Sequence, residues 1–194
     1  MTTVHSSSGH EVSIPEYEID IKKELRAGMN GILSARMREA GMPFKLIYGV
    51  ELPRLQSIAR DFPTDAGLAN HLWQLNIRET RLLAIMLMPA EDFTIEMSRK
   101  WAETIVTAEE AQVLASVLLP KTDGAKEICK IWLEGGKPFP AISACLCLRH
   151  LLVKGEDLSA EEHIFIQFKE KVHKPNLHLR KAIQALEAAF KEQI

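Results

Sequence analysis

Basic side chains gather in two segments of the sequence, one near each end. In FKEKVHKPNLHLRK the cations face a single acid, Glu170, and in the first predicted helical region they outnumber Glu24 and Glu39. Cations concentrated in this way can bind the phosphate groups of a nucleic-acid backbone. The alternative interpretation of the two segments is an ordinary solvated surface. We predict phosphate contacts by Lys22, Lys23, Arg26, Lys169, Lys171, Lys174, Arg180 and Lys181, with Arg36, Arg38 and Lys45 adding to the N-terminal concentration of charge.

A metal site is a second possibility to consider, because Cys145, Cys147 and His150 are close together in the sequence. On a helix, however, residues i and i+2 point apart, so only Cys147 and His150 would share a face. Two ligands are too few for a structural zinc site, and we predict neither a metal nor a cofactor. His173 and His178 flank a turn, and we assign no role to either.

The composition limits the class of protein. The chain has 194 residues, 46% of them hydrophobic, with a formal net charge of -2 and a pI of about 6.4. This predicts a folded protein without the global positive field that attracts nucleic acid or an anionic membrane. Three irregularly spaced cysteines favour reduced thiols, and the sequence has no leader-like segment or membrane-spanning run, so we expect a cytoplasmic protein with no membrane partner.

The positions of Pro and Gly predict a chain of short helices. Residues 1–14 are rich in Ser and Thr, and we expect a flexible arm there, followed by a single domain over residues 15–194. After Pro15, turn residues recur at short intervals, and the segments between them have helical rather than alternating apolar patterns. We expect no strand pair.

Local signals mark helix starts and buried faces. Thr107 with Glu110, and Ser159 with Glu162, fit the S/T-x-x-E capping box. Apolar residues follow one face in the segments 128–132 and 183–190. The runs RLLAIMLM and AISACLCLRHLLV are instead apolar around most of a helix, which requires cover on several sides.

This alternation of one-sided and all-round apolar helices is typical of stacked helical hairpins, because each hairpin buries its apolar face only against its neighbours. We therefore predict an all-α fold, an α–α superhelix of the HEAT/ARM-like solenoid type with about ten short helices. A globular bundle of longer helices is the alternative, and the frequent Pro and Gly residues disfavour it.

Three motifs resemble those of one known family. YGVELPRLQSIARDF looks like its G-[IV]-x-x-P motif, and NLHLRKAIQALEAAF is similar to its last repeat. The segment LWQLNIRETRLLA resembles its L-W-x-L-x-x-R-E-x-x-x-x-A motif through Leu72, Trp73, Leu75, Arg78, Glu79 and Ala84. This is the DNA alkylation repair family, glycosylases built from HEAT-like helical repeats, and the resemblance spans residues 48–190.

The resemblance implies, for active members, metal-free removal of N3- and N7-alkylated purines from duplex DNA held in a concave basic face. Aromatic rings and a carboxylate are implied to stabilise the cationic sugar as the glycosidic bond breaks. The active pattern, V-T-x-S-W-W-D-x-V-D, corresponds here to VTAEEAQVLA, residues 106–115. Ala111 and Ala115 stand where the family has its key tryptophan and catalytic aspartate, Ile142 where it has an arginine, and Ala185 where it has a last-repeat tryptophan.

With those side chains missing, Glu109 and Glu110 are the candidates for substitute acids. We favour the alternative interpretation, a capping box with first-turn carboxylates that complement the helix dipole. The family motif around Trp73, Arg78 and Glu79 is likewise interpreted as a packing tryptophan followed by a helix-start ion pair.

Three functions follow from these observations. The first is a diverged relative of the repair glycosylases that binds nucleic acid, such as duplex DNA, through its basic clusters with little or no glycosylase activity. The second is an active alkylpurine DNA glycosylase with relocated acids. The third is a non-enzymatic helical scaffold that binds a protein partner, a common use of solenoid surfaces.

Overall fold

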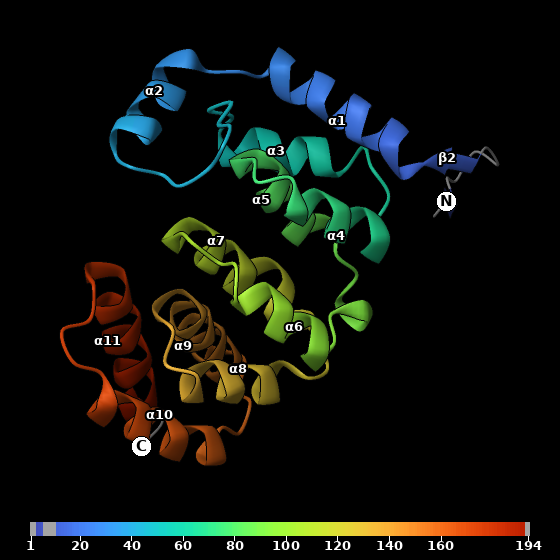
Figure 1. Cartoon of the computed structure of the whole chain (residues 1–194). Helices are drawn as coiled ribbons and strands as arrows, with labels where there is room; N and C mark the ends of the chain where they lie inside the picture. The colour runs from blue at the N-terminus through green and yellow to red at the C-terminus, as the bar shows by residue number, and fades with distance from the viewer. Residues whose placement is uncertain (1–2, 6–10, 193–194) are drawn as a thin grey trace. The chain divides into compact units, whose positions relative to one another are not determined.

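The computed structural model describes residues 3–5 and 11–192, and eleven α-helices account for most of them (Figure 1). This confirms the predicted all-α fold of about ten short helices. The chain folds as two compact units, the N-terminal unit Met1–Asp92 and the C-terminal unit Phe93–Ile194. The single domain expected over residues 15–194 stays a prediction.

A short hairpin precedes the helices. Strand β1 (Thr3–His5) pairs antiparallel with β2 (Glu11–Ser13), and Thr3 lies opposite Ser13. The expectation of no strand pair is therefore wrong here, because three-residue strands are too short to show an alternating pattern. Residues 1–2 and 6–10 of the predicted arm lie outside the described residues.

Five α-helices form the rest of the N-terminal unit. They are α1 (Ile14–Ala27), α2 (Gly31–Glu39), α3 (Leu52–Ala59), α4 (Ala66–Gln74) and α5 (Arg78–Leu87), followed by the 3-10 helix η1 (Ala90–Asp92). Helix α5 packs against both α3 and α4. All of its residues except Met86 are buried, as the all-round apolar run predicts.

The C-terminal unit is centred on one apolar helix. It contains α6 (Ile95–Ala102), α7 (Ala108–Val113), the π-helical segment η2 (Leu114–Leu118), the 3-10 helix η3 (Leu119–Lys121), α8 (Ala125–Glu134), α9 (Pro138–Val153), α10 (Ser159–Lys171) and α11 (Leu177–Glu192). Helix α9 packs against α7, α8 and α11, and α10 packs on α8 (Figure 1). The predicted inner helix is thus confirmed.

One of the two predicted helix starts is confirmed in detail. The box of Thr107 and Glu110 caps α7, and the structure adds a box that was not predicted, of Ser13 and Glu16 at the start of α1. The box predicted for Ser159 and Glu162 is wrong, although α10 does begin at Ser159. The Ser159 amide instead donates to the Asp157 carboxylate at 3.1 Å, and its hydroxyl donates to the same oxygen, because that carboxylate is a closer acceptor.

Candidate nucleic-acid interface

A buried ion pair starts helix α5. The Glu79 carboxylate accepts a hydrogen bond from the Arg78 guanidinium at 2.8 Å and from the backbone amides of Tyr48 at 3.0 Å and Gly49 at 2.9 Å. Arg78 also donates to the Val50 carbonyl at 2.9 Å. Both charges are therefore used to hold the buried segment 47–50, because a buried charge is tolerated only when it is paired and hydrogen-bonded.

The tryptophan of the same family motif also packs inside the N-terminal unit. The Arg81 guanidinium lies over the Trp73 ring, 3.9 Å from its centroid, and 5.9 Å from that of Phe44. Trp73 itself is 5% exposed. The motif therefore has the packing role predicted for it, and it presents no side chain for a ligand.

The positions at which the family carries its catalytic side chains are apolar and covered. Ala111, Ala115 and Ile142 are buried, and Ala185 is half-buried on α11. The Ser143 hydroxyl donates to the Ala111 carbonyl at 3.0 Å, so α7 and α9 are in direct contact here. These residues offer neither an aromatic face nor a carboxylate to an alkylated base.

The candidate acids belong to the start of α7. One Glu110 carboxylate oxygen accepts from the amides of Val106 and Thr107 and from the Thr107 hydroxyl, each at 2.9 Å. Glu110 is 1% exposed, and Glu109 lies half-buried in the same first turn. The capping interpretation of Glu110 is confirmed, since its carboxylate satisfies amides that the helix leaves without a carbonyl.

The three cysteines lie in the interior of the C-terminal unit. Burial raises the pKa of the Cys145 thiol to about 12, and a hydrogen bond with Cys147 together with burial raises the pKa of the Cys129 thiol. Protonated thiols are poor metal ligands. Among residues 3–5 and 11–192, no cluster of three His, Cys, Asp or Glu side chains has the geometry of a metal site, and no helix is long and apolar enough to cross a membrane.

The N-terminal basic cluster consists of Lys22, Lys23 and Arg26 and lies on α1. Lys22 donates to the Glu18 carboxylate, whose other oxygen is 2.6 Å from Nε2 of His71 on α4. Hydrogen bonds from Lys22 and then from His71 hold the pKa of Glu18 below its ordinary value. The charge of Lys22 is thus offset by a partner within the unit.

Lys23 lies among acids as well. It lines a hollow together with Asp20, Glu24 and Asp61. The Glu24 carboxylate also accepts from the Arg54 guanidinium at 2.7 Å. The surface around the N-terminal basic cluster therefore mixes both signs of charge, which weakens its attraction for a polyanion.

The C-terminal basic cluster has a different arrangement. Lys169 pairs with Glu187 at 3.1 Å and so joins α10 to α11. Its other members, Lys171, Lys174, Arg180 and Lys181, are exposed and form no ion pair within the described part of the chain. Four uncompensated cations thus lie between the last residue of α10 and the second turn of α11.

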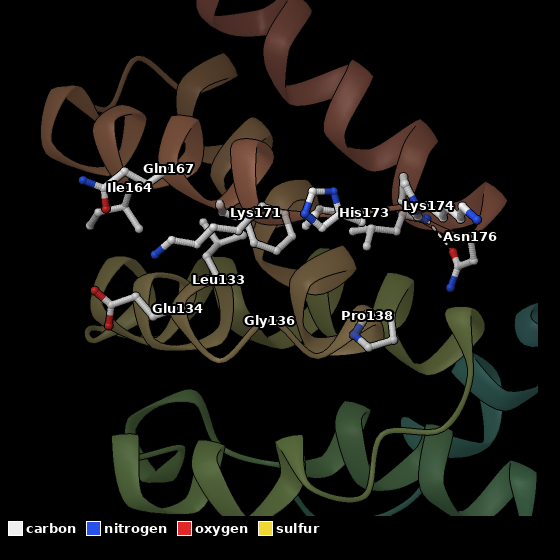
Figure 2. A pocket seen from close by; sticks show the side chains of 14 residues that line it. Leu133, Glu134, Gly136, Pro138, Ile164, Gln167, Lys171, His173, Lys174 and Asn176 are labelled. Atoms are coloured by element: carbon white, nitrogen blue, oxygen red, sulfur yellow. Dashed lines mark hydrogen bonds between the residues drawn. The ribbon is translucent and has the colours of Figure 1, made fainter.

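A pocket of about 450 Å³ opens beside this cluster. Its floor is apolar and includes Leu133, Phe168 and Leu179, while Lys171 and Lys174 belong to its rim. The remaining polar rim residues are Glu134, Gln167, His173 and Asn176. Figure 2 shows Glu134 and Gln167 at one end and Lys174 and Asn176 at the other, with the Lys171 side chain directed toward the Glu134 end.

This pocket, which we call the α10–α11 pocket, does not follow from the sequence pattern. We assigned no role to His173, and Glu134 stands at the start of the Gly- and Pro-containing segment EGGKPFP. The available signal was the presence of two turns next to Pro residues, which end α8 and α10. Their proximity depends on the packing of α10 against α8, and the sequence pattern contains no information on that contact.

A solved structure of another protein shares this fold. A solved structure described as "a new family of proteins related to the HEAT-like repeat DNA glycosylases with affinity for branched DNA structures" is similar, with a TM-score of 0.74 and 14% identity, covering 88% of this chain and 74% of that chain. No curated protein matches the sequence. The fold is therefore that of a HEAT-like helical repeat protein.

The sequence also matches the family described as DNA alkylation repair enzyme over residues 21–186. Because this match extends over most of the chain, the protein belongs to the DNA alkylation repair enzyme family. The resemblance seen in the three sequence motifs is thereby confirmed.

Proposed function

We propose that this protein binds DNA through its C-terminal basic cluster and has little or no glycosylase activity. The observation that carries the proposal is the set of four exposed cations without acidic partners around the start of α11, in a member of a DNA repair family. Such cations bind phosphates and release counterions, which is the main source of affinity for DNA.

The position of these cations on α11 supports anion binding. Arg180 and Lys181 lie near the N-terminal end of the helix, whose first turn contains no acid. Positive side chains are unfavourable there, because the helix dipole already places partial positive charge at this end. A phosphate group bound there would offset both the partial positive charge of the helix end and the charges of the basic side chains, since backbone amides and basic side chains favour the same ligand.

The low expected glycosylase activity rests on two observations. The positions corresponding to the family's tryptophan, aspartate and arginine hold the buried residues Ala111, Ala115 and Ile142. The nearest candidate acid, Glu110, accepts three hydrogen bonds from the start of its own helix. Neither arrangement provides the preorganised carboxylate that a cationic sugar requires.

Branched DNA is the form of DNA that we propose first. The similar solved structure is described by its affinity for branched DNA structures, and its likeness to this chain is one of fold. We extend the same preference to this protein, with the N-terminal basic cluster as a predicted second contact. Lys23 and Arg26 are the exposed members of that cluster.

Fluorescence anisotropy tests the proposal. Labelled intact duplex, duplex with an abasic-site analogue and a four-way junction are titrated with protein over a range of salt concentrations. Four phosphate contacts predict that log K falls with log salt with a slope of about −3.6. Base release from alkylated DNA is measured in parallel and should stay at the uncatalysed level. Absence of binding at low salt would contradict DNA binding and leave the protein-scaffold function.

A further inference from the structure

We propose that the α10–α11 pocket binds one nucleotide unit, with its phosphate at the cationic end and its base over the apolar floor. The proposal rests on the proposed DNA binding for one of its two ligand sources, an unpaired nucleotide of a DNA strand. The other source is a free nucleoside monophosphate, which has the same chemistry.

The shape of the pocket fits a ligand of this size. Its volume of about 450 Å³ falls within the range of pockets that hold small organic molecules. The floor consists of the buried side chains Leu133, Phe168 and Leu179, which come from three different helices. Such a floor favours the flat apolar face of a base, whereas inorganic phosphate alone would gain nothing from it.

The end of the pocket at the α10–α11 turn supplies phosphate ligands. Lys174 and His173 belong to this turn, and Lys174 forms no ion pair in the described part of the chain. The Asn176 side-chain oxygen accepts from the Leu179 amide at 2.8 Å. The NH2 group of the same side chain is therefore directed away from that hydrogen bond and supplies donors. The Lys174 ammonium and the neighbouring donor groups at this end therefore match a phosphate.

The opposite end of the pocket carries acceptors. Glu134 and Gln167 lie there, away from Lys174 and Asn176, and the Lys171 side chain is directed toward this end as well (Figure 2). A carboxylate repels a simple anion, but it accepts hydrogen bonds from an exocyclic amino group. A ligand that is negative at one end and has amino hydrogens at the other fits this arrangement. Among nucleotides, those with cytosine, adenine or guanine have such an amino group and those with thymine do not.

The first experiment uses free nucleotides and the whole protein. Amide NMR spectra are recorded during titration with 5′-dCMP, 5′-dTMP and inorganic phosphate. We expect shifts at pocket residues, and about tenfold tighter binding of 5′-dCMP than of either other probe, for one additional hydrogen bond to a charged group. Equal binding of 5′-dCMP and inorganic phosphate, or shifts spread over the protein surface, would overturn the proposal.

Two substitutions in the pocket should change ligand binding in opposite directions. Lys174→Asn removes the charge and suits the backbone, because Lys174 has φ of 52° and Asn tolerates this conformation better than most residues. It should weaken 5′-dCMP binding about tenfold. Glu134→Gln should strengthen phosphate binding and reduce the preference for 5′-dCMP over 5′-dTMP, because the remaining acceptor oxygen is uncharged. Glu170→Gln, on the exposed surface of α10 outside the pocket, should change neither.

The second experiment distinguishes the two ligand sources. Anisotropy compares a fully paired duplex with the same duplex carrying one unpaired cytidine nucleotide. If the source is DNA, the unpaired nucleotide raises affinity about tenfold in the wild type, and Lys174→Asn removes that gain. Lys181→Gln, outside the pocket, should weaken both duplexes equally. If the free nucleotide binds but the two duplexes bind alike, the source is a free nucleoside monophosphate.

The two proposals fail in different ways. Salt-dependent binding of the paired duplex, with no effect of the unpaired nucleotide and no binding of 5′-dCMP, would overturn the pocket proposal and leave the proposed function intact. Binding of 5′-dCMP at the pocket without any binding of DNA would overturn the proposed function and support the pocket as a site for a free nucleotide.

Discussion

The Glu79 carboxylate lies 2.8 Å from the Arg78 guanidinium, and the two side chains are 0% and 2% exposed. This pair holds the backbone of Tyr48, Gly49 and Val50 through three further hydrogen bonds. The pair therefore connects the start of α5 to a segment about thirty positions earlier in the chain. Loss of the Glu79 carboxylate would remove the acceptor of the Tyr48 and Gly49 amides and the negative charge beside Arg78.

Removal of this carboxylate should be strongly destabilising. We expect Glu79→Ala to lower the free energy of unfolding by about 3–5 kcal/mol, because the buried Arg78 charge then loses the Glu79 carboxylate, and the Tyr48 and Gly49 amides lose their acceptor. Urea denaturation measures the change. Glu24→Ala is the control, since Glu24 pairs with Arg54 at the exposed surface and should cost at most about 1 kcal/mol. Similar costs for the two variants would contradict the structural role of Glu79.

Gly49 should tolerate no side chain. Its φ is 77°, and a Cβ atom would lie 2.3 Å from the Asn30 carbonyl oxygen. Gly41 has a φ of 79° but nothing within 4 Å of the corresponding Cβ, so Gly41→Ala bears only the backbone cost of about 1–2 kcal/mol. Gly49→Ala should cost about 1–3 kcal/mol more, from steric overlap. Thermal and urea unfolding of both variants measure the difference.

Glu110 should matter for stability and not for base release. Glu110→Ala leaves two amides at the start of α7 without acceptors, and we expect it to lower the free energy of unfolding by about 1–3 kcal/mol. Glu110→Gln keeps an oxygen in place and should cost less. A measurable base-release rate in the wild type that Glu110→Gln abolishes would instead support an active glycosylase.

The contact between α1 and α4 should depend on pH. The folded-state pKa of Glu18 lies below its ordinary value of 4.5, so its stabilising effect is present above pH 4.5 and is lost as the pH falls through the lowered pKa. Glu18→Gln should be less stable than wild type by about 1 kcal/mol at pH 7. The difference should shrink below pH 4.5 in urea unfolding measured at several pH values. A difference that grows at low pH would contradict the assignment.

Individual lysines should change the salt dependence of DNA binding. Lys181→Gln removes one of the exposed cations without an acidic partner, so the slope of log K against log salt should decrease in magnitude by about 1. Lys154→Gln makes the same change of charge at the end of α9, outside the C-terminal basic cluster, and should leave the slope unchanged. Equal effects of the two substitutions would show that the cluster has no special role.

The helices and most of their buried faces follow from local residue patterns. The run RLLAIMLM is apolar around most of a helix, and Leu82, Leu83, Ala84, Ile85 and Leu87 of α5 are buried for that reason. Thr107 and Glu110 marked the start of α7, because a capping box acts within four residues. Ala111 and Ala115 likewise excluded the usual catalytic side chains, since the identity of a residue sets its chemistry wherever it is placed.

The helix packing sets which charges lack an ion-pair partner and where a pocket forms. Lys22 and Lys171 look equivalent in the sequence, yet Lys22 donates to Glu18 and Lys171 lines the α10–α11 pocket. Electrostatic pairing depends on distances of a few ångströms through space, and sequence separation does not give those distances. Glu134 and His173 meet at one pocket for the same reason, because the packing of α10 on α8 brings their two turns together.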